Sequence, residues 1–298
     1  MADISRSEVA SLIAEEYANT LLASAAASST ALSAFPTVSM GTKTTNMPVL
    51  ATLPEADWVS ETEAKPTSKV TWANKTLVAE EIAVILPVHE NVLDDASVSI
   101  LDELAALGGS AIGKKLDQAV LFGTDKPTTW TSPALVPAAT TAGNVVANVD
   151  GNANTSDLYG AIVQAAGMVA GDGYIPSTLL TSLALRYRMA NIRNADGNLA
   201  FQGESFAGFN TVFNQNGVWD PAAAEAIVVD ASKVRIGVRQ DITVKFLDQA
   251  TVGGINLAER DMVALRIKAR YAYVLGHGAT SLSTTGTPVS VVTPDVTP

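Results

Sequence analysis

The residues best suited to chemistry lie in one short stretch near residue 90. His89 is followed directly by Glu90, and Asp94 and Asp95 come about one helical turn later. Imidazole and carboxylate groups at this spacing could ligate a metal or form an acid–base pair. A strand that ends at His89, followed by a helix with an aspartate N-cap, explains the same residues, because aspartate is a favoured N-cap. We therefore interpret this stretch as a structural junction.

The other motifs of catalytic type are incomplete. Residues 203–208 read G-E-S-F-A-G, one residue longer than the G-x-S-x-G turn that exposes a nucleophilic serine. Gly171 and Gly173 lack the third glycine of a phosphate-binding loop. The chain has no cysteine, which excludes disulfides, thiolate metal sites and a cysteine nucleophile. We expect no catalytic residue, metal or cofactor, and a protein that is not an enzyme; an unfamiliar hydrolase is the alternative.

Residues 53–68 form an acidic loop that carries one tryptophan. Four carboxylates against the single positive charge of Lys65 give this loop a net charge of −3. Catalytic carboxylates are held on rigid elements, whereas a loop between two strands has no core of its own to bury Trp58. We therefore predict that the loop contacts another chain. The predicted contact residues are Glu55, Asp57, Trp58, Glu61, Glu63, Lys65 and Lys69.

An acidic loop needs a basic receiver on the chain that it contacts. Basic side chains lie on two predicted helices, near residues 114 and 190. Exposed ion pairs contribute about 0.2–1 kcal/mol each, whereas truncating a buried aromatic anchor commonly costs about 2 kcal/mol or more. Trp58 is therefore expected to matter more than any single charge. The candidate receivers are Lys114, Lys115, Arg186, Arg188 and Arg193.

The elements around the loop are long and regular. An apolar strand over residues 47–52 leads into it, and residues 69–88 alternate with a period of two, which predicts a long returning strand. A helix of about 27 residues follows and ends at Gly123, a favoured C-terminal residue. Gly108 and Gly109 interrupt this helix at about 1 kcal/mol each. Two glycines kept at this cost predict a bend in the helix or a close crossing with another element.

The rest of the chain is a mixture of helices and strands, which indicates an α+β fold. The capping sequence Ser5-x-x-Glu8 predicts an amino-terminal helix. Further helices are predicted from Leu158 and over residues 179–192, with a loop-dominated boundary over residues 124–154. The predicted strands are residues 226–229, 234–238, 242–246 and 263–274, and the predicted exposed tail is residues 280–298.

Composition limits the classes of function. Charged residues make up 16% of the chain, against about 25% in ordinary soluble domains. We interpret this shortage as surface that neighbouring subunits cover; an alanine-rich soluble enzyme is the alternative. The net charge of −11 argues against wrapping of a phosphate backbone. The acidic first 20 residues do not fit a signal peptide, and no apolar run reaches 18 residues, so we expect folding in a cytosol without membrane contact.

The order of these segments resembles that of the major capsid proteins of tailed bacteriophages, which share the HK97-like fold. The acidic loop is similar to the family's extended loop, and the stretch from Ile85 to Asp95 resembles the entry to its spine helix. Residues 121–125 resemble the helix exit, residues 185–198 the axial-domain helix and turn, and residues 234–242 with 266–273 the closing strands.

The resemblance implies a division of the chain. We expect an amino-terminal arm over residues 1–38 and the extended loop with its flanking strands over residues 39–90. A peripheral domain with the spine helix would hold residues 91–150 and 236–274. An axial domain and carboxyl-terminal tail would hold residues 151–235 and 275–298.

The resemblance also implies a function and partners. Hexamers and pentamers of this chain would form an icosahedral shell that encloses double-stranded DNA without sequence-specific binding. The shell would assemble in the cytoplasm of a host bacterium with a portal protein and, in some relatives, decoration proteins. Only 38 residues precede Ser39 and the chain starts with Met1, so we expect a separate scaffolding protein, or none, in place of a fused and cleaved segment. An encapsulin shell, which packs enzymes, is the alternative.

One member of the family joins a loop lysine covalently to an asparagine of a neighbouring chain, assisted by a glutamate. Lys65 and Lys69 occupy the loop here, but no asparagine aligns as their partner. We therefore expect no covalent link between chains.

Overall fold

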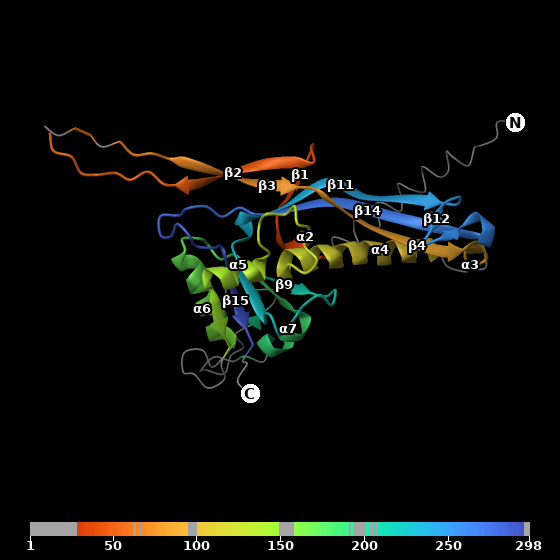
Figure 1. The fold of residues 1–298 in the computed structure, drawn as a ribbon. Coiled ribbons are helices and arrows are strands. Elements are labelled where there is room, and N and C mark those ends of the chain that lie inside the picture. The colour runs from red at the N-terminus through yellow and green to blue at the C-terminus, as the bar shows by residue number, and fades with distance from the viewer. Residues whose placement is uncertain are drawn as a thin grey trace.

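The computed structural model describes residues 29–61, 64–65, 67–94, 100–148, 158–190, 192, 201–202, 205–206 and 208–294. The predicted α+β class is confirmed. Figure 1 shows a body from which a thin hairpin extends on one side, while a long sheet and a long helix extend on the other. The predicted amino-terminal helix lies outside the described residues.

The long sheet has four strands in the order β1-β11-β14-β4. Strands β11 (Val234–Leu247), β14 (Met262–Leu275) and β4 (Glu80–His89) are antiparallel neighbours, and β1 (Thr37–Ser39) joins β11 in parallel. The two strands predicted at residues 234–238 and 242–246 are one strand. Its register shifts between Val238 and Thr243, and these irregularities break the sequence alternation.

Helix α4 (Ile100–Asp117) packs against one face of this sheet. Ile112 and Leu116 are buried with Leu265 and Ile267 of β14 in one core cluster. A Cβ added at Gly108 would collide with the Ile267 side chain, so glycine permits the close approach of helix and sheet. The predicted close crossing is confirmed.

A single π-helical turn (Gln118–Phe122) continues α4, and the helical stretch ends at Gly123 in a left-handed conformation with φ 76°. This confirms the predicted stop. A separate short helix, α3 (Glu90–Asp94), precedes α4, so Asp94 is a helix residue and not an N-cap as predicted; Asp95 lies outside the described residues.

Strands β2 (Thr44–Thr52) and β3 (Thr71–Val78) pair with each other as a separate two-stranded sheet. We call residues 44–78, which comprise both strands and the loop between them, the arm. The long strand predicted over residues 69–88 is broken at the buried Ala79, because β3 belongs to the arm whereas β4 belongs to the four-stranded sheet. The predicted strand–loop–strand order is confirmed.

A second sheet of seven strands forms the lower part of the body in Figure 1. Helix α6 (Leu158–Gly171) covers one face of this sheet, with Ile162 and Ala165 buried against it. Its strands, in spatial order, are β5 (Val145–Ala147), β15 (Val289–Thr293), β10 (Ala226–Val229), β6 (Thr178–Ser182), β9 (Phe209–Asn214), β8 (Ser205–Phe206) and β7 (Phe201–Gln202).

Two predictions in this region are wrong in part. Residues 178–182 form strand β6, and helix α7 (Leu183–Ala190) begins only after it. The apolar run fits a strand because its residues are buried between β10 and β9. The stretch predicted as loop over residues 124–154 contains helix α5 (Leu135–Ala142), which buries Leu135, Ala138 and Ala139.

The prediction of an exposed tail is wrong in part, because residues 286–292 are buried whereas residues 281, 282, 284 and 285 are exposed. Strand β15 lies inside the seven-stranded sheet, between β5 and β10. Val289 and Val291 pack toward α5, whereas Val292 packs toward α6, and the Ser290 hydroxyl donates to the carbonyl of Ala165 at 2.7 Å. The short remaining elements are a 3-10 turn at Ala231–Lys233, the β12 (Thr251–Val252) and β13 (Ile255–Asn256) hairpin, a 3-10 turn at Ala258–Arg260, and α2 (Thr30–Ala34).

Candidate interaction site

The junction near residue 90 does not form a chemical site among the described residues. His89 ends β4 and is exposed, and the backbone N–H of Glu90 donates to the carbonyl of Asp261 at 2.9 Å. In the described part of the chain, His, Asp and Glu side chains form no group of three that could hold a metal. In the G-E-S-F-A-G stretch, residues 203, 204 and 207 lie outside the described residues.

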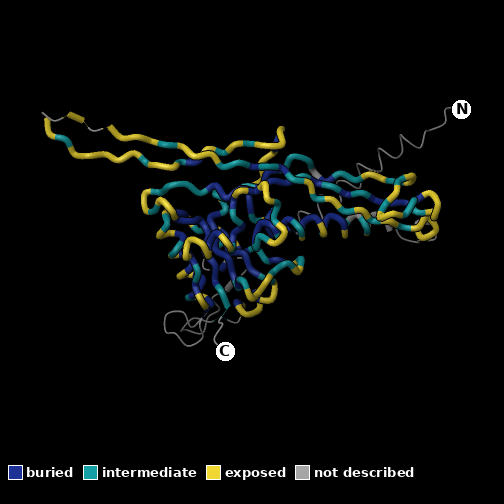
Figure 2. Tube along the Cα trace, in the orientation of Figure 1, coloured by how far each residue is buried: buried dark blue, intermediate teal, exposed yellow. Residues whose placement is uncertain are grey.

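The arm stands away from the body of the described chain. Figure 2 shows it as a thin hairpin with exposed residues along most of its length. Two contacts join its sides beyond the ladder: the Thr52 and Thr71 hydroxyls lie 2.6 Å apart, and the N–H of Glu55 donates to the Ser68 hydroxyl at 2.8 Å. These contacts hold the base of the loop closed.

The predicted contact residues of the loop point to solvent. Trp58 is fully exposed, and Glu55, Asp57 and Glu61 are exposed without an ion pair among the described residues. Lys65 and Lys69 are also exposed, while Glu63 lies outside the described residues. Burying a side chain of tryptophan's size removes a large apolar area from water. An exposed Trp58 amid unpaired carboxylates is therefore suited to contact with a partner.

The root of the arm, in contrast, is anchored in the body. Leu77 is buried with Met40 and Val274 in a small cluster. The N–H of Ala279 donates to the carbonyl of Leu50 at 2.8 Å, and the indole N–H of Trp130 donates to the carbonyl of Val78 at 2.9 Å. The body thus fixes the direction in which the arm leaves it.

The predicted basic receivers do not form one site. The ammonium of Lys115 pairs with Asp125 at 2.6 Å, and the guanidinium of Arg188 pairs with Glu225 at the same distance. The guanidinium of Arg186 in α7 lies over the ring of Phe213 in β9. Lys114 is exposed on α4 and has no ion pair among the described residues, and Arg193 lies outside them. Two of the five charges are therefore already neutralised within the chain.

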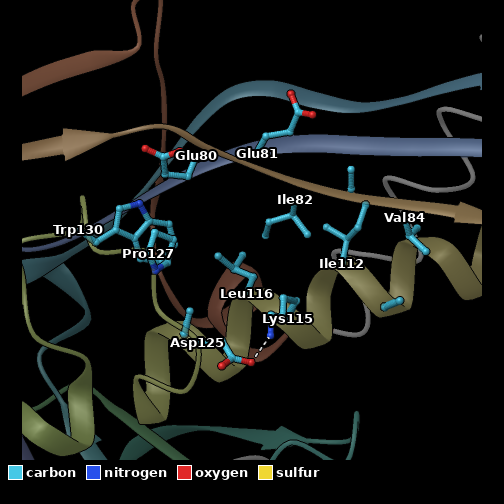
Figure 3. Close-up of a pocket in the computed structure, with 13 residues that line it drawn as sticks. Glu80, Glu81, Ile82, Val84, Ile112, Lys115, Leu116, Asp125, Pro127 and Trp130 are labelled. Carbon is cyan, nitrogen blue, oxygen red and sulfur yellow. Dashed lines mark hydrogen bonds and ion pairs between the residues drawn. The ribbon is translucent and has the colours of Figure 1, made fainter. Parts of the chain in front are cut away.

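A groove of about 430 Å³ lies between β4 and α4. Figure 3 shows Ile82, Ile112 and Leu116 directed into it, with the Lys115–Asp125 ion pair at its edge. Glu80 and Glu81 of β4 add negative charge on the opposite side of the groove. This charge disfavours an acidic loop as the occupant.

A set of basic residues that the sequence prediction missed lies on the four-stranded sheet. Lys245, Arg266, Lys268 and Arg270 belong to β11 and β14, and we call them the basic face. In the ladder Lys245 is opposite Arg266, and Thr243 is opposite Lys268. The available signal was the alternation R-I-K-A-R over residues 266–270, since alternate side chains of a strand share a face.

Asp117 at the end of α4 is buried and accepts hydrogen bonds from five donors. Burial raises the pKa of its carboxyl above the ordinary value, and the donors oppose this rise. The carboxylate therefore holds residues 29–31, where the described chain begins, against the end of α4. The donors are the Ser29 hydroxyl, the N–H groups of Thr30 and Ala31, and the amides of Asn214 and Asn216.

No helix in the described part of the chain is long and apolar enough to span a membrane.

Comparison with known proteins gives a consistent result. The model of the phage capsid family matches residues 10–279. A chain in a solved structure of Mycobacterium phage Adephagia is 64% identical and covers 100% of both chains, with a TM-score of 0.85. A chain of Microbacterium phage Oxtober96 is 42% identical over 90% of this chain and 91% of that chain, with a TM-score of 0.82. The major capsid protein of Staphylococcus phage 80alpha is 38% identical over 66 residues, which are 22% of this chain and 20% of that protein.

Proposed function

Because this chain belongs to the phage capsid family, we infer that it is a major capsid protein, a structural and non-enzymatic subunit of the icosahedral shell of a phage. It has the HK97-like fold, and its place is the virion capsid. Self-assembly is therefore the function around which the molecule is built.

We propose that the chain forms the hexamers and pentamers of this shell. The observation that carries the proposal is the arm, which leaves the body with an exposed Trp58 and unpaired carboxylates at its loop. Tryptophan is enriched among the few residues that carry most of the binding energy of protein–protein interfaces. In a ring of identical subunits, each arm can lie on the next subunit, so that every chain both gives and receives one contact.

We assign the four-stranded sheet and α4 to the peripheral domain of the shell, and the seven-stranded sheet with α6 and α7 to the axial domain. The two sheets support this division because each has its own helix, α4 on the four-stranded sheet and α6 on the seven-stranded sheet, while one core cluster joins residues of both sheets. The carboxyl-terminal strand β15 joins the axial domain, since it pairs with β5 and β10. Residues 286–292 are therefore part of the core of that domain.

We propose that the shell encloses double-stranded DNA without reading its sequence. The net charge of −11 supports this view. An acidic wall does not bind the phosphate backbone tightly, because such binding requires clustered positive charge. A portal protein, a separate scaffolding protein and decoration proteins are the further partners that we propose for the shell.

The experiment that tests this function removes the loop and leaves the body. Residues 54–67 are replaced by two glycines, and the variant and the wild type are produced with and without the phage's other assembly proteins. We expect sedimentation to show particles for the wild type and free or loosely associated chains for the variant, with the same far-UV circular dichroism for the body. Particle formation by the variant at wild-type yield would contradict the role of the arm.

A further inference from the structure

A cleft of about 310 Å³ lies between the root of the arm and the body. Its volume is at the lower end of the range for sites that hold small molecules. The acidic loop at the far end of the arm contributes nothing to it. The arm supplies Met47 and Trp72 to the lining of this cleft, and the body supplies Tyr174, Lys233 and Arg235.

Hydrogen bonds hold the walls of the cleft in place. The N–H of Ala279 in the body donates to the carbonyl of Leu50 in the arm at 2.8 Å. The Tyr174 hydroxyl donates to the carbonyl of Gly278 at 2.7 Å, which fixes this ring in the body wall. The arm and the body are therefore in contact beside the cleft, and the space between them is part of the fold.

Cationic side chains approach the cleft from both walls. Lys233 and Arg235 line it from the body. On the arm, Lys75 is opposite Met47 in the ladder and lies two residues before the buried Leu77. Opposite residues of an antiparallel pair share a face, as do alternate residues of one strand. Lys75 therefore lies on the face of the arm that is turned toward the body.

These three cations are not neutralised by the described part of the chain. None of Lys75, Lys233 and Arg235 forms an ion pair with a carboxylate there. The ammonium of Lys233 lies 6.0 Å from the centre of the Tyr174 ring, and the guanidinium of Arg235 donates to the carbonyl of Val234 at 3.1 Å. Burial lowers the pKa of Lys75, because removal of water without an opposite charge disfavours the ammonium form.

The carboxylates near the cleft bind other donors. Burial raises the pKa of Tyr174 most, and the nearby charges of Asp172 and Asp230 add to this rise. Asp230 accepts from the N–H and the hydroxyl of Ser232. Asp172 accepts from the N–H of Thr287 at 2.9 Å. The cations on the two walls therefore repel one another, and an anion between them would offset this repulsion.

We propose that the cleft binds a small phosphate compound of the nucleotide class. Trp72 is 66% exposed although it lines the cleft. An exposed ring beside cations matches the two parts of a nucleotide, because bases stack on aromatic rings and phosphates bind Arg and Lys. The phosphate lies at Lys233 and Arg235, and the base stacks on Trp72. The bound phosphate also attracts Lys75 and so fixes the arm to the body. The net charge of −11 disfavours duplex DNA as the source of the phosphate.

Calorimetric titration of the unassembled full chain tests the site with three probes: deoxyadenosine monophosphate, inorganic phosphate and deoxyadenosine. We expect the nucleotide to bind more tightly than phosphate, and deoxyadenosine not to bind because it carries no charge. Lys233→Gln with Arg235→Gln should weaken nucleotide binding about tenfold or more, since charge-assisted hydrogen bonds are lost. Trp72→Ala should remove the advantage of the nucleotide over phosphate. The matched control, Lys114→Gln with Lys245→Gln, removes the same charge elsewhere and should bind like the wild type.

Hydrogen–deuterium exchange tests whether the ligand fixes the arm. With saturating nucleotide, we expect slower exchange of residues 44–52 and 71–78 in the wild type and the control, and no change in the variant that lacks the two cleft cations. Equal binding by that variant and the control would overturn the proposal, as would equal binding of deoxyadenosine and its monophosphate by the wild type, a comparison that needs no variant. Tighter binding of a duplex oligonucleotide or an acidic peptide would assign the cleft to a macromolecule and also overturn it. Because no particles are needed, failure of this site leaves the proposed assembly function untouched.

Discussion

At the scale of single residues, Asp117 links three parts of the chain. Its carboxylate accepts from residues 29–31, from Asn214 and from Asn216, so it joins α2, the end of α4 and the end of β9. This contact fixes the point from which the chain extends toward its amino terminus. A charged group in such a position is structural and serves no chemistry, because its partners are all hydrogen-bond donors of the fold.

Asp117→Ala is expected to destabilise the chain strongly. The substitution leaves several buried donors without an acceptor, which costs about 1–3 kcal/mol for each unsatisfied group before the structure relaxes. We expect a net loss of about 3 kcal/mol in the free energy of unfolding, measured by urea denaturation. The control is Asp125→Asn, which removes the exposed ion pair with Lys115 and should cost less than about 1 kcal/mol. Equal effects of the two substitutions would refute this role.

His277 is expected to make stability depend on pH. Burial lowers the pKa of His277, the charge of Lys75 lowers it further, and a backbone hydrogen bond to Leu275 opposes both. Its buried Nδ1 has no partner among the described residues. The unfolded chain therefore binds a proton more readily than the folded chain, so stability is complete above pH 6.5 and declines as the pH falls toward the folded pKa.

The test compares urea denaturation of the wild type and His277→Gln over this range of pH. We expect the variant to lose less stability on acidification, because glutamine does not titrate. A pH dependence identical to that of the wild type would show that other groups control the acid response.

The acidic loop residues could be predicted from sequence because their exposure follows from local composition. The sequence did not predict that the residues of the basic face lie together, although the alternation R-I-K-A-R is visible in it. Which residues share that face depends on the strands that lie beside β14. Lys115 and Arg188 were reasonable candidates until the structure paired them with Asp125 and Glu225. Such pairings join residues far apart in the sequence, and a single sequence does not give them.

At the scale of elements, the arm separates assembly from folding. Trp58→Ala is expected to reduce particle yield more than Glu61→Ala, because truncating a buried aromatic anchor commonly costs about 2 kcal/mol or more, against about 0.2–1 kcal/mol for an exposed ion pair. Both variants should keep the circular dichroism of the wild-type monomer, since both side chains are exposed in the isolated chain. Unfolding of the Trp58→Ala monomer would mean that Trp58 belongs to the core of its own chain.

Elements with strong periodicity were predictable, and elements defined by their surroundings were not. The alternation of β4 and the glycine stop after α4 are local signals, and both predictions are confirmed. Strand β15 is a short V-S-V-V-T run in a Ser/Thr/Pro-rich stretch, and only its burial between β5 and β10 makes it a core strand. The residues of β6 were predicted as part of a helix, because a short apolar run fits a strand and a helix equally well.

At the scale of the whole molecule, the shell is expected to be held by non-covalent contacts. Lys65 and Lys69 are exposed in the loop, and neither has an asparagine partner that the sequence aligns. Particles boiled in detergent should therefore run as a single band at 30.9 kDa on a denaturing gel. A ladder of higher bands from the wild type would show that chains are linked covalently and that this prediction is wrong.

The shape of the chain explains why it needs neighbours. The arm extends from one side of the body and the long sheet from the other, and most of the arm is exposed. In the proposed rings the arm would lie against a neighbouring copy, and assembly would bury more area per chain than a standard interface of about 1,600 Å².

The measurement that tests this account most directly is electron cryomicroscopy of particles assembled from the full chain, with the phage's other assembly proteins where required. We predict closed shells with five-fold and six-fold rings, in which the loop of each chain lies on a neighbouring subunit and Trp58 is buried there. A chain that stays monomeric under every assembly condition would contradict the account, as would shells in which the loops project freely into solvent.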